Sequence, residues 1–342
     1  MDNSSHNIRQ ASLQDITNFL VSNGEKAFRA KQIWQWIWQR GVTDFEEMTN
    51  LSRTTRELLR QNWYFDCLEP VHIQTATDGT TKTAWKLYDG EIIESVLIPG
   101  NQKFTVCVSS QVGCKLGCKF CATGTLGFKR NLTYGEIFNQ VTAAKMAAEA
   151  QGFPLSNIVF MGMGEPMLNY DNVLAAIERI TAEDGLAMSP YRITVSTAGI
   201  PDKIRQLADD GVRFNLAVSL HAAKENVRTS LMPINKAYSL KEVADSLKYF
   251  VEKTGTRPTF EYLLLKDIND SLEDAKALAF YCRQFPIKIN LIEYNNVEGS
   301  GFQHSPDKKR DEFVKYLENC NMVVNIRRSK GRTGVCRIQI LV

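Results

Sequence analysis

From residue 104 onward, short apolar segments alternate with helical segments of about a dozen residues. The first helical segment opens with a capping box formed by Thr133 and Glu136. Regular alternation of strands and helices predicts an α/β fold with a parallel sheet and right-handed crossovers. Six such units fit either a partial barrel or a doubly wound sheet, and periodicity does not choose between them. The expected strands are 104–110, 157–163, 192–197, 214–221, 259–265 and 288–294, and residues 322–328 form a further strand-like segment.

The first hundred residues have a different character. Residues 11–62 show helical periodicity, with 27–38 as the clearest helix and Gly41 as its stop signal. Residues 70–99 alternate in the manner of strands around two Asp-Gly turns, which predicts a small sheet. We therefore expect a helical domain at 1–68, a β-rich extension at 69–103, the α/β domain at 104–325 and a tail at 326–342.

Composition limits the class of protein. The 342 residues are 44% hydrophobic and 23% charged, which is typical of a globular protein and excludes disordered and fibrous classes. No apolar run is long enough to span a membrane, and the N-terminus lacks the pattern of a signal peptide, so we expect a cytoplasmic protein. Eight cysteines in such a chain indicate metal ligands, catalytic thiols or core residues. Core positions are the default for Cys67, Cys282 and Cys320.

The helical domain mixes basic and aromatic residues, although the net charge of the whole chain is only +3. This mixture suits contact with RNA phosphates and stacking on bases. It equally suits a small domain whose tryptophans fill its core, and the sequence does not choose between the two. The residues concerned are Lys26, Arg29, Lys31, Arg40, Arg53, Arg56 and Arg60 with Trp34, Trp36, Trp38 and Trp63.

Three cysteines lie in one loop between the first strand and the first helix of the α/β domain. Cys114, Cys118 and Cys121 have the spacing C-x-x-x-C-x-x-C, which brings three thiolates to one metal centre. A structural zinc or an ordinary ferredoxin cluster needs four protein ligands. A cubane held by three cysteines leaves one iron free to bind a small molecule. The alternative is a zinc knuckle that takes a fourth ligand from elsewhere, such as Cys107.

Polar residues follow the ends of the next strands, where ligands gather in parallel α/β folds. They comprise the turn at 162–166 after the second strand, Ser196, the segment Ser219 to His221, and Asn295 after the sixth strand. Each alone is more often a helix cap or a turn residue. Their common rim makes them candidates for binding a ligand.

Six short motifs narrow the match to one family: 94–99, 107–114, 127–132, 195–197, 219–221 and 290–295. With them, the chain resembles the RlmN/Cfr family of radical S-adenosylmethionine (SAM) enzymes over nearly its whole length. The resemblance implies an open (β/α)6 barrel, a 4Fe–4S cluster on the three loop cysteines, and SAM as the second cofactor. The SAM-binding residues implied are Gly164, Glu165, Ser196, Ser219, Leu220, His221 and Asn295.

The resemblance also implies a reaction, which is methylation of adenine C2 at adenine 2503 of 23S rRNA and adenine 37 of tRNA. One SAM methylates a cysteine near the C-terminus, to which Cys336 corresponds, and a second SAM yields the 5′-deoxyadenosyl radical that activates this methyl group. Glu94 matches the base that removes the C2 proton, and Cys107 matches the cysteine that releases the product through a transient disulfide. The implied partners are the two RNAs and an electron donor such as flavodoxin or ferredoxin, with the enzyme acting as a monomer away from membranes.

The tail departs from the family pattern. The family has Ala and Gly on either side of the methyl-carrying cysteine, whereas Cys336 lies between Val335 and Arg337. Either a remodelled loop presents Cys336 to the site, or the altered tail leaves a catalytically impaired RNA-binding homologue. A radical SAM activase of another protein is a further alternative.

Overall fold

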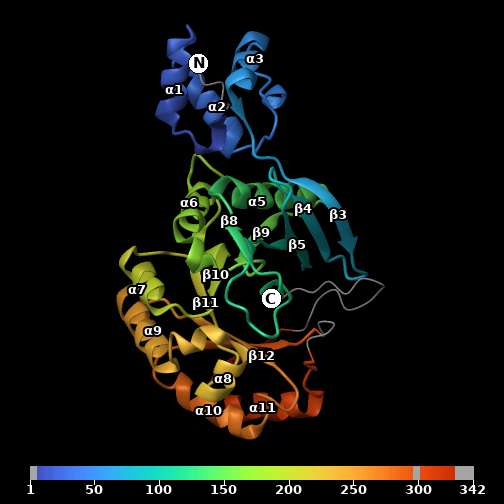
Figure 1. Ribbon diagram of the computed structural model, residues 1–342, viewed down its shortest axis with the longest axis vertical. Helices are drawn as coiled ribbons and strands as arrows, with labels where there is room; N and C mark the ends of the chain where they lie inside the picture. Colours follow the sequence, from blue (N-terminus) through green and yellow to red (C-terminus); the bar gives the residue numbers. More distant parts are fainter. Residues whose placement is uncertain (1–5, 296–300, 328–342) are drawn as a thin grey trace.

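A computed structural model describes residues 6–295 and 301–327, and within these ranges one ten-stranded sheet organises the molecule (Figure 1). Seven of its strands are parallel and follow the chain in order across the sheet. The sheet does not close, because β14 lies at one edge and the N-terminal extension at the other. The expected open barrel is confirmed. Its strands are β6 (Lys103–Cys107), β9 (Leu155–Phe160), β10 (Ile193–Thr197), β11 (Asn215–Ser219), β12 (Thr259–Leu264), β13 (Lys288–Glu293) and β14 (Val323–Arg327).

Helices cover the outer face of the barrel (Figure 1). Three of them begin with a complete capping box, at Thr133, Ser239 and Ser271, which supplies partners for the free amides of the first turn. No helix within the described ranges is long and apolar enough to cross a membrane. The helices are α5 (Tyr134–Glu149), α6 (Tyr170–Thr181), α7 (Pro201–Asp209), α8 (Glu225–Leu231), α9 (Leu240–Thr254), α10 (Leu272–Cys282) and α11 (Asp307–Asn319).

The β-rich extension continues the barrel sheet instead of forming a separate small sheet. Its strands β3 (Glu69–Thr75), β4 (Thr81–Lys86) and β5 (Ile92–Gly100) are antiparallel, and β5 pairs with β6 through Val96 opposite Cys107. The alternating pattern predicted these strands but not the edge they join, because that edge is set by packing between distant segments. The extension thereby brings Glu94 next to the first barrel strand.

The N-terminal helices α1 (Leu13–Ser22), α2 (Arg29–Trp38) and α3 (Arg53–Asn62) form a group at one end of the long axis (Figure 1). The side chains of Trp36 and Trp38 are only 9% and 1% exposed, and Trp38 packs against Tyr134 and Phe138 of α5. These two tryptophans therefore belong to the core and do not present a stacking face to RNA.

Cysteines outside the loop differ in burial. Cys282 is buried and Cys320 half-buried, but Cys67 is exposed. The default of a core position is thus wrong for Cys67, which lies in the irregular segment between β2 (Trp63–Tyr64) and β3 and points its thiol toward the carbonyl of Thr43.

Candidate functional site

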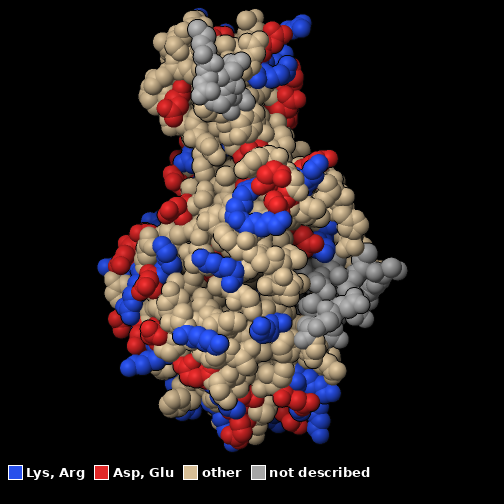
Figure 2. Space-filling view, viewed as in Figure 1, with Lys and Arg blue, Asp and Glu red and all other residues tan. Residues whose placement is uncertain are grey.

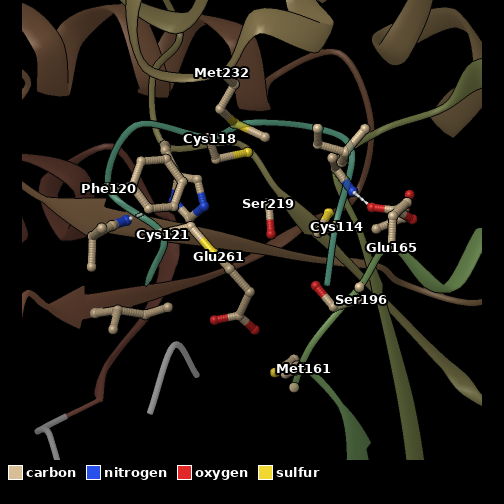
Figure 3. Close-up of a pocket in the computed structure, with 18 of the residues that line it drawn as sticks. Cys114, Cys118, Phe120, Cys121, Met161, Glu165, Ser196, Ser219, Met232 and Glu261 are labelled. Carbon is tan, nitrogen blue, oxygen red and sulfur yellow. Dashed lines mark hydrogen bonds between the residues drawn. The ribbon is translucent and has the colours of Figure 1, made fainter. Parts of the chain in front are cut away.

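An open cavity lies at the C-terminal ends of β9 to β13. Its position is the one expected for a ligand site in a parallel α/β fold. The three loop cysteines, two serine hydroxyls and the carboxylates of Glu165 and Glu261 share this lining, with Cys114 close to Glu165 (Figure 3). The lining includes six of the seven residues implied as binding SAM, namely Gly164, Glu165, Ser196, Ser219, His221 and Asn295. Leu220, the seventh, is fully buried beside the cavity and does not line it.

The cysteine loop is closed at its base by a two-stranded hairpin. The strands β7 (Gln111–Gly113) and β8 (Phe128–Asn131) pair, and the amide of Cys114 donates to the carbonyl of Gly127 at 2.8 Å. Gly113 has φ +73°, and a Cβ there would lie 1.8 Å from this same carbonyl oxygen. The close approach of the two backbones therefore requires glycine at this position.

The three thiols are shielded from water. Burial raises the pKa of Cys114 to about 11 and also raises the pKa values of Cys118 and Cys121. No group of three His, Cys, Asp or Glu side chains in the part of the chain that the structure describes is arranged to hold one metal ion. Three thiolates beside an open cavity fit the donor set of a cubane, in which each cysteine binds a different iron and the fourth iron stays uncovered.

Glu165 lies at the end of the cavity next to β9. Its carboxylate accepts hydrogen bonds from the amides of Met167 (3.1 Å) and Ala198 (2.7 Å), and burial raises its pKa to about 7. Both oxygens keep lone pairs that can accept further bonds. The preceding Gly164 has φ +100° and lies against the backbone of Gln111, so the turn brings main chain close to the cavity.

His221 has a defined orientation in the cavity wall. Its Nδ1 accepts a hydrogen bond from the amide of Leu263 at 3.0 Å, and its ring contacts Phe120 edge-on. Burial, together with the nearby Arg228 cation, lowers the pKa of His221 to about 3. The imidazole is therefore neutral at pH 7, with its proton on Nε2.

Glu94 and Cys107 do not line the cavity. Cys107 is 2% exposed and packs in a small cluster with Val96 that also contacts Met161, a residue of the cavity lining. Burial raises the pKa of Cys107 to about 12. The Glu94 carboxylate is 40% exposed and pairs with Lys82 Nζ at 2.8 Å on the neighbouring strand β4. Met161 thus contacts both the Cys107 cluster and the cavity.

Cys336, the residue that corresponds to the methyl carrier, lies outside the described residues.

The lining residues that the sequence analysis missed include Phe120, Met161 and Glu261. Phe120 and Met161 are apolar residues in apolar surroundings and carry no signal of their own. Glu261 does, because it is the one charged residue of the apolar strand β12.

Figure 2 shows one face of the molecule, which includes the cysteine loop. Lysine and arginine atoms lie around the middle of this face, whereas acidic atoms are more frequent toward its periphery. On the loop, Lys115 and Lys119 are exposed, and their neighbours Cys114 and Cys118 line the cavity.

Two family models match the chain. The Ribosomal RNA large subunit methyltransferase N-terminal domain matches residues 6–64, and the Radical SAM superfamily matches residues 108–279. A probable dual-specificity RNA methyltransferase RlmN of Flavobacterium johnsoniae is 46% identical over 326 residues, which cover 95% of this chain and 93% of that protein. The dual-specificity RNA methyltransferase RlmN of Oleidesulfovibrio alaskensis is 44% identical over 331 residues, with 95% and 92% covered.

The fold has a close match among solved structures. The crystal structure of a radical SAM methyltransferase from Sphaerobacter thermophilus superposes with a TM-score of 0.91 at 37% sequence identity. The superposition covers 95% of this chain and 96% of that one.

Proposed function

Because the chain belongs to the RlmN family of radical SAM RNA methyltransferases, we propose that it methylates C2 of adenosine at adenine 2503 of 23S rRNA and adenine 37 of tRNA. The observation that carries the proposal is the single cavity that joins three loop cysteines to the polar rim of β9–β13. The cysteines of this cavity can bind a cluster, and its polar rim can bind a nucleoside cofactor.

Cys114, Cys118 and Cys121 would hold the 4Fe–4S cluster, and its uncovered iron with SAM supplies a carbon radical. Glu165 would accept hydrogen bonds from the methionine ammonium, which favours the charged form of this buried carboxylate. Ser196, Ser219, His221 and Asn295 would orient the remainder of SAM. The neutral His221 offers Nε2–H as a donor in this set.

The chain's own residues would complete the methylation. Cys336 would carry the methyl group to the base, and Glu94 would take the proton from adenine C2. Once deprotonated, Cys107 would then attack the Cys336 sulfur and break its S–C bond to the base. The freed CH₂ carbon takes up a proton to become the methyl group, and a disulfide between the two cysteines remains. Because Cys107 is 2% exposed and does not line the cavity, its surroundings would have to rearrange for this step. Lys82 would keep the Glu94 carboxylate directed along β4 until substrate binds.

RNA recognition would involve the N-terminal domain and the basic face around the cysteine loop. The match of residues 6–64 to an rRNA methyltransferase domain supports this role, which the alternative of a protein activase does not explain. Since ribosomes and tRNA are cytoplasmic, we expect a cytoplasmic monomer that receives electrons from a small carrier such as flavodoxin or ferredoxin.

Reconstituted enzyme tests the proposal when it is incubated with methyl-labelled SAM, a reductant and either RNA. We expect label at C2 of the two target adenines and none when the target adenine is replaced by guanine. Cleavage of SAM without label in RNA would contradict the assignment and favour an impaired homologue.

Mass analysis of the purified protein tests the methyl carrier separately. We expect 14 Da of added mass, one methylene equivalent, on the peptide that contains Cys336, and none on that peptide in Cys336→Ala. Methylation of RNA by Cys336→Ala would exclude this cysteine as the carrier.

A further inference from the structure

Glu261 is a buried carboxylate whose role the proposed reaction leaves open. It lies on β12 between apolar neighbours, its side chain is directed into the cavity, and the residue is 3% exposed (Figure 3). Placing a carboxylate there is costly unless it has hydrogen-bond partners. Glu261 therefore needs hydrogen-bond partners that offset the cost of burying its charge.

One oxygen of Glu261 is held by a row of polar side chains across three neighbouring strands. Glu261 lies opposite Asn290 on β13, which lies opposite Asn325 on the edge strand β14. Asn325 Nδ2 donates to Asn290 Oδ1 at 3.2 Å, and Asn290 Nδ2 donates to Glu261 Oε1 at 2.8 Å. The nearest cation, Arg327, is also on the side of Oε1, at 3.8 Å. This row fixes the carboxylate in one orientation.

The other oxygen, Oε2, is buried and has no hydrogen-bond partner among the described residues. An unpaired buried oxygen destabilises the folded protein, and burial raises the pKa of this carboxyl group. Donors that approach Oε2 would remove the penalty and favour the charged form. Oε2 can therefore accept a hydrogen bond from a donor group on a ligand.

The order of the strands indicates which part of a ligand reaches Oε2. Along the rim, Glu165 follows β9, Ser196 lies on β10, Ser219 on β11, Glu261 on β12, and Asn295 follows β13. SAM has its ammonium at one end, its adenine at the other and its ribose between them. If the ammonium binds at Glu165, the ribose lies opposite the residues of β11 and β12. Ser219 and Glu261 are register partners on these two strands.

We propose that Glu261 accepts hydrogen bonds from the ribose hydroxyls of SAM through Oε2, with Asn290 and Asn325 as positioning residues. An acidic side chain that binds ribose hydroxyls is a recurrent solution for nucleoside cofactors. The inference rests on the proposed function, because it takes SAM as the ligand of the cavity and Glu165 as the partner of its ammonium.

Calorimetric binding to the cluster-loaded enzyme provides the test, with SAM and its 2′-deoxy and 3′-deoxy analogues as ligands. We expect at least one deoxy analogue to bind wild type roughly 10-fold more weakly than SAM, as for loss of a hydrogen bond to a charged group. This comparison uses the unaltered protein and does not depend on any variant folding. Equal binding of SAM and both analogues would overturn the proposal.

Glu261→Gln supplies the second half of a double-mutant cycle. Gln keeps the oxygen that Asn290 holds and places an amide NH₂ where Oε2 was, so the charge-assisted bond is lost. We expect SAM to bind this variant roughly 10-fold more weakly than wild type, with its preference over the deoxy analogue largely abolished. Retention of the wild-type preference would overturn the role of Glu261.

Two further variants serve as controls. Glu273→Gln removes a charge outside the cavity lining, where the carboxylate pairs with Lys276 at 2.8 Å, so the preference for SAM should persist. Asn325→Ala is at an exposed position and should weaken SAM binding a few-fold in wild type, but not in the Glu261→Gln background. Additive effects of the two substitutions would exclude the positioning role of Asn325. Failure of wild type to bind SAM at all would instead reject the proposed function itself.

Discussion

The imidazole of His221 illustrates how a single buried residue sets a pH dependence. Its pKa is lowered from 6.5 to about 3 in the folded protein. At a pH between these two values, the imidazole is protonated in the unfolded chain but not in the folded protein. Stability must therefore fall as pH drops below about 6.5. From pH 7 to pH 5, this residue alone should cost roughly 2 kcal/mol of unfolding free energy.

Urea unfolding at pH 7 and pH 5 measures this loss. His221→Asn is the matched variant, because Asn tolerates the positive φ of 56° found at this position and does not titrate. We expect wild type to lose more stability than the variant on acidification. An equal loss in both proteins would mean that His221 is protonated in the folded state.

The three loop thiols should act as a unit in metal binding. Cys118→Ser replaces a soft sulfur ligand by a hydroxyl, so we expect its iron and sulfide content after reconstitution to fall to near background. Cys282→Ser is the control, because this buried thiol lies on α10, outside the cavity lining, and should leave the iron content unchanged. Wild-type iron content in Cys118→Ser would show that the cluster does not depend on this ligand.

At the scale of elements, the β7–β8 hairpin determines whether the cysteine loop can form. Gly113→Ala would place a Cβ 1.8 Å from the carbonyl oxygen of Gly127, at φ +73°. Gly127→Ala has the same φ of +73° but meets no atom within 4 Å, so it carries the backbone strain without the clash. That strain alone costs about 1–2 kcal/mol.

We therefore expect Gly113→Ala to bind less iron than Gly127→Ala and to unfold at lower denaturant. Parallel reconstitution and chemical denaturation of the two variants check both quantities. Equal iron content and stability would show that the hairpin opens without consequence for the loop.

The strands and the cavity lining differ in how well the sequence predicted them. The parallel strands were predictable, because apolar alternation and helix caps are local signals, although the first strand ends at Cys107 and not at residue 110. Their order followed only from the family resemblance, because periodicity fits a doubly wound sheet equally well. The strand-end rule identified part of the cavity lining. It could not reveal the contact of Met161 with the Cys107 cluster or the row that orients Glu261, since both depend on packing between distant strands.

At the scale of the whole molecule, Arg9 joins the N-terminal helices to the barrel. Its guanidinium is fully buried and donates to the carbonyls of Ile37 (2.8 Å) and Val42 (2.9 Å). These carbonyls lie at the C-terminal end of α2 and in the segment that follows it. It also lies 5.2 Å from the ring centre of Phe138 on α5, and the Tyr134 hydroxyl of α5 donates to the Arg9 carbonyl. Burial lowers the pKa of Arg9 to about 10, so it remains a cation at pH 7. One residue thus satisfies groups on both sides of the junction.

Arg9→Met should uncouple the N-terminal helices from the barrel. It leaves two buried carbonyls without donors, at about 1–3 kcal/mol each, and removes the cation from the aromatic rings. Because Trp34, Trp36 and Trp38 all lie on α2, tryptophan fluorescence should report unfolding of this domain at lower temperature than far-UV circular dichroism reports for the barrel. Arg40→Met is the control, since Arg40 is exposed and contacts Trp36 at 4.1 Å without bridging to α5. Coincident fluorescence and dichroism transitions in Arg9→Met would show that the domains remain one cooperative unit without this residue.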